Sequence, residues 1–133
     1  MEKTTNLLAT KVRIVGSITE VQEQIGVLQN EGYIRDHIFV LTHDKDRTSR
    51  IADNTDATTI GISEEGLGTA IANIFRSTGD ELRAKMRSLG ISKYDAERLE
   101  NEMDRDKVLV IGWGGKEYTG EDFDPTIYYY TYY

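Results

Sequence analysis

An apolar segment followed at once by a dense polar segment constrains the fold of this chain more than any other feature. The run Ile38–Leu41 is rich in β-branched and aromatic residues, which predicts a mostly buried strand. His43, Asp44 and further charged residues follow directly, and the polar stretch continues to Gly61. In open α/β sheets, ligands tend to bind just beyond the carboxyl end of a strand. A functional site is therefore best sought here, on grounds of location rather than chemistry.

Length and composition limit the class of protein. The 133 residues fit one domain with a single modest core, and the absence of cysteine excludes a disulfide framework and agrees with a reducing compartment. We find neither a signal-peptide pattern nor an apolar run of about 18 residues, so we expect a cytoplasmic protein that does not bind membranes. The net charge of −7, from 23 acidic and 16 basic side chains, argues against a nucleic-acid partner.

Hydrophobic periodicity predicts that the chain begins with a βαβ-like unit. Residues 11–15 alternate between apolar and basic side chains, as expected of a strand. Ser17 and Glu20 have the spacing of a capping box at a helix start, and Gly32 can end that helix. The strand at residues 38–42 follows, and a right-handed crossover is expected between the two strands.

The middle of the chain is predicted to be helical. Ser63 can cap a helix, Thr78 with Glu81 repeats the capping-box spacing before a helix that Gly90 ends, and Ser92 can open the last helix. The apolar face of the first of these helices would consist of Leu67, Ala70, Ile71, Ile74 and Phe75. The buried stripe of the last helix would consist of Ala96, Leu99 and Met103.

These elements indicate an α+β fold with a small sheet of three, or at most four, strands. Residues 108–111 give the third core strand, and the closing αβ unit makes a ferredoxin-like or related arrangement plausible. We expect residues 1–113 to form a single α+β domain and residues 114–133 an acidic, Tyr-rich C-terminal extension. Residues 127–133 are β-prone and would need a sheet edge or a neighbouring subunit, which suggests a homodimer through that edge or tail.

A glycine-rich segment at residues 61–69 resembles a phosphate-binding loop but lacks its defining lysine. Leu67 stands where the lysine would reach the phosphates, and Glu64 and Glu65 would repel an anion at the helix N-terminus. We therefore predict no nucleotide cofactor.

The aspartates around His43 could supply ligands to a divalent cation, but turn chemistry explains them more simply. An EF-hand loop starting at Asp44 would need glycine and glutamate where Ser49 and Thr55 stand. Aspartates in such segments cap short helices, as Asp46 could do for a helix over residues 47–53. We therefore predict no metal.

Catalysis finds little support in the sequence. A serine or threonine nucleophile needs a base, and only His37 and His43 could supply an imidazole. His37 lies at the start of a strand and is expected to pack or to face solvent, whereas His43 at the strand outlet is the better candidate. No nucleophile-elbow pattern is present, so we predict neither an enzyme nor a cofactor.

The basic residues that come nearest to forming a cluster lie among acidic residues, which suggests a solvated helix face. They are Arg76, Arg83, Lys85 and Arg87.

The order of several segments resembles the YflT-type heat-induced general stress protein family. LTHDKDRTSRIADNTDATTIG is followed by the Glu64–Gly66 turn, an apolar segment at residues 70–75, GDELR and a closing KVLVIG. The resemblance spans about residues 12–112 and implies a cytoplasmic general stress protein, with no catalytic residue or cofactor to transfer. Its characteristic segment maps onto a candidate functional or structural signature. The signature consists of His43, Asp44, Asp46, Arg47, Thr48, Ala52, Asp53, Asn54 and Thr55.

Two hypotheses of function follow. The first is a general stress-response protein without a catalytic site that acts through protein–protein contact or self-association. The alternative is a small-ligand- or metal-binding domain, or an enzyme, that uses the loop from His43 to Asp46. A concave pocket onto which His43 and neighbouring charges converge would favour this alternative.

Overall fold

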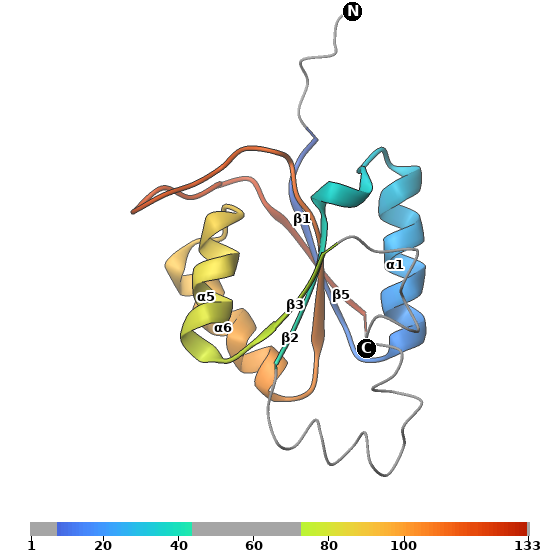
Figure 1. Cartoon of the computed structure of the whole chain (residues 1–133), viewed down its shortest axis with the longest axis horizontal. Helices are drawn as coiled ribbons and strands as arrows, with labels where there is room; N and C mark the ends of the chain where they lie inside the picture. The colour runs from blue at the N-terminus through green and yellow to red at the C-terminus, as the bar shows by residue number, and fades with distance from the viewer. Residues whose placement is uncertain (1–7, 44–72, 133) are drawn as a thin grey trace, which may run out of the picture.

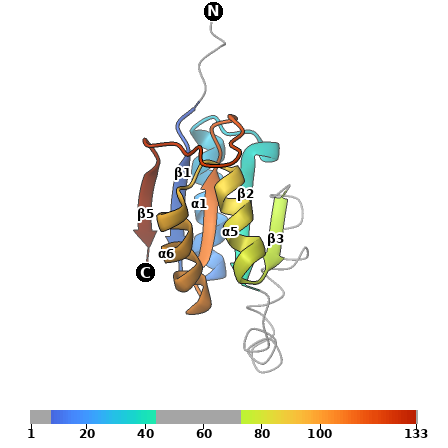
Figure 2. The ribbon, with the colours of Figure 1, turned by 90° about the vertical axis from the view of Figure 1, so that its left-hand side faces the viewer.

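The computed structural model of the chain describes residues 8–43 and 73–132. In Figure 1 a mixed β-sheet lies between helix α1 on one face and helices α5 and α6 on the other, and Figure 2 shows the same arrangement from the side of α5 and α6. The elements are β1 (Lys11–Val15), α1 (Ile18–Asn30), the 3₁₀ helix η1 (Arg35–His37), β2 (Ile38–His43), β3 (Asn73–Ser77), α5 (Gly79–Ser88), α6 (Lys93–Asp104), β4 (Val108–Gly112) and β5 (Tyr128–Tyr132).

The sheet has five strands in the order β3-β2-β4-β1-β5. Strand β4 is antiparallel to both β1 and β2, whereas β3 is parallel to β2 and β5 is parallel to β1. The other four strands therefore run in one direction around a central antiparallel strand. The predicted start of the fold is a split βαβ unit, since β4 lies between β1 and β2. The α+β class is confirmed.

The predicted number of strands is wrong, and the ferredoxin-like arrangement is not confirmed. The sheet gains β3 and β5, one at each edge (Figure 2). Ile74 and Phe75, expected on a helix, belong to β3 and pair with Val40 and Leu41 of β2. Their partly buried side chains pack against opposite faces of the sheet. These contacts, next to a paired strand, override the helical spacing. The rest of that predicted helix lies outside the described residues.

Alternation along the strands divides the core into two layers. Side chains such as Leu41 and Leu109 point towards α5 and α6, and side chains such as Val40 and Val110 point towards α1. The predicted stripe of α6, Ala96, Leu99 and Met103, is buried as expected. Gly112 of β4 permits the close packing of α1, because a Cβ there would come within 2.8 Å of Leu28. None of the helices in the described part of the chain has the length and apolar character needed to cross a bilayer.

The helix boundaries follow the predicted caps with one exception. Ser17 Oγ accepts from the Glu20 N–H at 3.2 Å, and Ser92 Oγ accepts from the Asp95 N–H at 3.2 Å. Thr78 precedes α5 as predicted, but its side chain makes no capping hydrogen bond. Helices α1 and α5 end at glycines in the left-handed region, Gly32 at φ +111° and Gly90 at φ +108°.

The C-terminal extension packs against α5 and then adds a strand to the sheet. Residues 114–127, called the strap below, arch over one end of α5 between β4 and β5 (Figure 1). The Asp124 N–H donates to the Gly90 carbonyl at 2.7 Å, and Arg87 donates to the Gly120 carbonyl at 2.7 Å. The tyrosine-rich end then forms β5 on the edge of this chain's own sheet, one of the two surfaces that the sequence suggested. The division into residues 1–113 and 114–133 stays a prediction.

Candidate functional site

His43 is the last residue of β2 and lies nearly buried on the face covered by α5 and α6. Its Nε2 atom lies 3.0 Å from Glu100 Oε2 on α6 and 4.0 Å from Asp104 Oδ1. The predicted outlet of the strand therefore holds an imidazole directed at carboxylates from one helix.

A chain of ion pairs continues from this contact. Glu100, whose side chain is 14% exposed, places Oε1 3.5 Å from an Arg83 guanidinium nitrogen of α5. Arg83 also pairs with Asp80 one turn earlier in the same helix, and nearby Ser77 Oγ donates to Glu81. These contacts connect the carboxyl ends of β2 and β3 to both helices. The charged groups that surround His43 here bind one another.

This arrangement suits a structural role better than general-base catalysis. A base must reach a substrate proton through an accessible ring nitrogen. His43 Nε2 faces the Glu100 carboxylate within hydrogen-bond distance, and the second ring nitrogen, Nδ1, is buried. Among residues 8–43 and 73–132, no three histidine or acidic side chains are grouped so that they could hold a metal ion.

Of the signature predicted from the sequence, the structure describes His43 alone. The residues that lie outside the described part of the chain are Asp44, Asp46, Arg47, Thr48, Ala52, Asp53, Asn54 and Thr55. The short helix expected after Asp46 and the glycine-rich segment at residues 61–69 lie outside it as well.

Sequence reasoning missed Arg83 and Glu100 as partners of this site. They stand 17 residues apart on different helices, so no local spacing pairs them. One signal was available for Glu100, which follows Ala96 by four residues and therefore borders the buried stripe of α6. A carboxylate in that position needs a partner.

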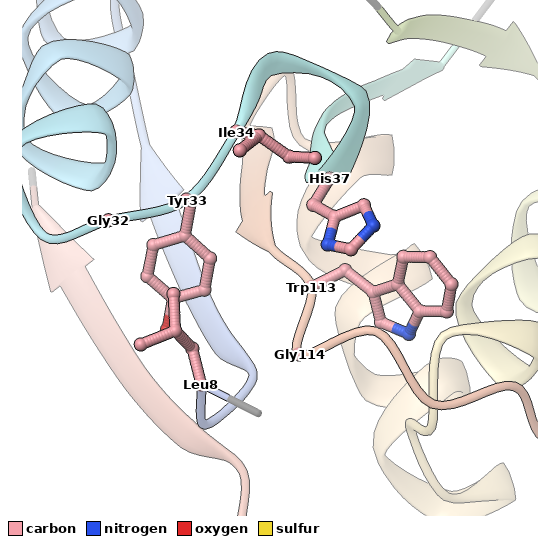
Figure 3. Close-up of a pocket in the computed structure, with 7 residues that line it drawn as sticks. All are labelled: Leu8, Gly32, Tyr33, Ile34, His37, Trp113 and Gly114. Atoms are coloured by element: carbon pink, nitrogen blue, oxygen red, sulfur yellow. The ribbon is translucent and has the colours of Figure 1, made fainter. Parts of the chain in front are cut away.

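A small apolar pocket lies at the opposite end of β2, and Figure 3 shows the side chains that line it. The His37 ring packs against the Trp113 indole with centroids 4.8 Å apart, as the packing alternative for His37 predicted. Tyr33 and Leu8 face them across the hollow, and the Tyr33 hydroxyl donates to the Ala9 carbonyl. The pocket has a volume of about 170 Å³ and no serine, threonine or acidic residue in its lining. The lining thus gives His37 no nucleophile to activate.

The tyrosine-rich strand β5 forms the second candidate surface. The Tyr129 hydroxyl donates to Asp95 Oδ2 of α6 at 3.1 Å, and burial followed by the Asp95 charge raises the pKa of Tyr129 well above its usual value. On the other face, the Arg13 guanidinium lies 5.1 Å from the centre of the Tyr130 ring. These contacts hold β5 to the body of the protein from both faces. Tyr128 and Tyr130 nevertheless remain 52% and 38% exposed.

The fold and these contacts define a small α+β domain in which the charged groups described around His43 pair with one another and the sheet ends in an exposed tyrosine-rich strand. The chain belongs to the family described as heat induced stress protein YflT domain, which matches residues 10–106 and confirms the resemblance seen in the sequence. General stress protein 17M of Bacillus subtilis (strain 168) is 43% identical over 92 residues, which are 69% of this chain and 80% of that protein. No solved structure matches the chain.

Proposed function

We propose that the protein is a general stress-response protein that works by self-association through the outer edge of β5 rather than by catalysis. Family membership and the name of its relative, a general stress protein, support the stress-response role. One observation supports this mode of action. The edge strand β5 is rich in exposed tyrosine and, among the described strands, pairs with β1 on one side and with no strand on the other.

The backbone of β5 offers a second strand a set of hydrogen-bonding groups. The Tyr128 N–H donates to the Thr10 carbonyl at 3.2 Å and therefore points towards β1. Because backbone groups alternate in direction along a strand, Tyr129 and Thr131 direct their N–H and C=O groups away from β1. Such unpaired groups are a template for another strand.

The composition of β5 favours a second copy of the same chain. Its sequence, YYYTY, contains none of the proline, lysine or inward charges by which edge strands usually resist pairing. The net charge of the chain is −7, so most of its surfaces would repel a second copy, but an antiparallel β5–β5 contact brings no charged side chains of the strand together. Two sheets would then join about a twofold axis into one continuous sheet.

The geometry of the β2 outlet supports the non-catalytic part of the proposal. His43 Nε2 pairs with Glu100, which also pairs with Arg83, and the second ring nitrogen of His43 is buried. Neither nitrogen of this imidazole is therefore open to a substrate. The alternative of a ligand or metal site in the loop from His43 to Asp46 depends on residues 44–46, and no described contact favours it.

The test compares Thr131→Pro with Thr131→Val. The exposed Thr131 donates nothing to β1, so proline removes an outward N–H without breaking the existing ladder, whereas valine keeps that N–H and the β-branched shape. Sedimentation equilibrium should give a dimer for the wild type and for Thr131→Val and a monomer for Thr131→Pro. Circular dichroism should show that all three are equally folded.

Two results would contradict the proposal. One is a wild-type protein that remains a monomer at every concentration tested. The other is a Thr131→Pro variant that dimerises as tightly as the valine variant, since a dimer of that kind would not depend on the β5 edge. If the wild type is a monomer yet binds a heterologous strand through β5, the edge is used by another protein and self-association is wrong.

A further inference from the structure

A second cavity, of about 280 Å³, lies between the sheet, the C-terminal turn of α5 and the strap. Its walls are largely aromatic, with Phe39 from β2, Trp113 after β4 and Tyr118 from the strap. Two charged side chains, Lys85 and Glu117, reach the same cavity. It lies at the end of β2 opposite His43, so it is separate from the ion-pair chain described above.

Lys85 is the unusual member of this lining. The sequence placed it on a solvated helix face, but its Nζ atom lies 4.6 Å from the centre of the Phe39 ring and 5.9 Å from that of Phe75. In the described part of the chain, no acidic side chain lies within ion-pair distance of this nitrogen. A chain of net charge −7 thus holds a half-buried cation on two aromatic rings, and none of the described carboxylates pairs with it.

The cavity walls are fixed before any ligand arrives. Trp113 packs against His37, and its indole N–H donates to the Lys116 carbonyl at 2.9 Å. Tyr118 lies against Gly90, where a Cβ would come within 2.8 Å of the ring. Walls held in this way lose little conformational entropy when a ligand binds, which favours affinity.

We propose that this cavity binds a small aromatic monocarboxylate, with its ring against Trp113 and Tyr118 and its carboxylate on Lys85. Aromatic walls favour a flat ring through offset or edge-to-face contact. A single ammonium group in a partly desolvated site favours one carboxylate through a charge-assisted hydrogen bond. Glu117 in the same lining would repel a second negative charge, which disfavours a phosphate dianion.

The site depends on a part of the chain outside the family match. Glu117, Tyr118 and Thr119 of the strap form one wall, whereas the match ends at residue 106. The inference is therefore about this chain in particular. It is also independent of the proposed self-association, because none of the residues that line the cavity belongs to β5.

The chain carries its own reporter, because Trp113 is the single tryptophan of the sequence. Tryptophan fluorescence would be followed while the full-length protein is titrated with benzoate, with benzamide as the neutral analogue and acetate as the anion without a ring, all at constant ionic strength. Benzoate should give a saturable change with Kd on the order of 1 mM, as expected for so small a ligand. Benzamide should bind more weakly, and acetate should give no saturable change.

Lys85→Met and Lys93→Met form a matched pair of variants. Both remove one positive charge and keep the length of the side chain, but Lys93 is exposed on α6 and does not line the cavity. Lys85→Met should weaken benzoate about tenfold and make benzoate and benzamide bind alike, since one charge-assisted contact is lost. Lys93→Met should bind benzoate as the wild type does.

Glu117→Gln supplies a second, independent test, because removal of the opposing charge should tighten benzoate and leave benzamide unchanged. The proposal is overturned if benzoate gives no saturable change with the wild type, or if the two lysine variants bind it equally. If Lys85→Met fails to fold by circular dichroism, the Glu117→Gln comparison decides: equal affinities of wild type and variant for benzoate would overturn the proposal.

Discussion

The Tyr129 hydroxyl joins the edge strand β5 to helix α6 through Asp95, and this contact links protonation to stability. Burial and the neighbouring Asp95 charge raise the pKa of Tyr129 from its usual 10.0 in the folded chain. Below about pH 10 the phenol is protonated in both folded and unfolded chains, so its contribution to stability is complete. Above that pH the unfolded chain releases the proton while the folded chain retains it, so the free energy of unfolding falls as pH rises.

Replacement of Tyr129 by phenylalanine tests this linkage. At neutral pH the variant loses one hydrogen bond to a carboxylate that Arg98 also binds, at a cost of about 1 kcal/mol. Above pH 10 its stability should fall less steeply than that of the wild type. Urea unfolding followed by circular dichroism at several pH values measures both effects, with Tyr94→Phe as the exposed control. Parallel stability curves for Tyr129→Phe and the wild type would show that Tyr129 contributes nothing to alkaline sensitivity.

For individual residues, the sequence predicted where His43 lies in the fold but not which side chains it contacts. His43 was placed at the outlet of a strand because an apolar run ends there, and the structure agrees. Its partner Glu100 and the cation Lys85 were beyond sequence reasoning, because their roles depend on packing between helices and the sheet rather than on local spacing. For Lys85 the charge pattern was misleading, since neighbouring Asp80 and Glu81 suggested a solvated face although Lys85 lies over a ring of β2.

Helix α1 and helix α5 begin at residues of the same chemical type but with different contacts. The Ser17 side chain accepts a backbone hydrogen bond at the start of α1, whereas the Thr78 side chain accepts none at the start of α5. Ser17→Ala should therefore lower the free energy of unfolding by about 1 kcal/mol, and Thr78→Ala should change it by no more than about 0.5 kcal/mol. Urea unfolding curves of the two variants give the comparison, and equal losses would show that the cap geometry does not determine stability here.

Whole elements were predictable where periodicity and caps agreed. The elements β1, α1, β2, α5, α6 and β4 were assigned correctly. Their apolar spacing agreed with the capping serines of α1 and α6 and with the terminal glycines of α1 and α5. Strand β3 was missed because Ile74 and Phe75 fit a helical face as well as a strand that makes apolar contacts on both faces. The β character of the tail was evident from its tyrosines, but its parallel pairing with β1 depends on the course of the strap.

For the whole molecule, the sheet order predicts how firmly each strand is held. Strand β4 lies at the centre with β2 and β1 on either side, whereas β5 at one edge depends on β1 and on a few side-chain contacts. Backbone amides of β4 should therefore exchange with solvent through unfolding of most of the protein, and those of β5 through local release of the edge strand. The proposed association would act on one of the two edge strands, which are held less firmly than the centre.

Hydrogen exchange measured residue by residue by NMR at low and high protein concentration would test the fold and the association together. In a monomer the amides of Tyr130 and Tyr132 face β1 and should be protected, while those of Tyr129 and Thr131 face outward and should exchange quickly. Association through β5 adds partners for the outward amides, so Tyr129 and Thr131 should become protected as concentration rises, with little change in β4. Rapid exchange of both outward amides at the highest concentration would mean that no second strand covers this edge, and the protein would have to act through another surface.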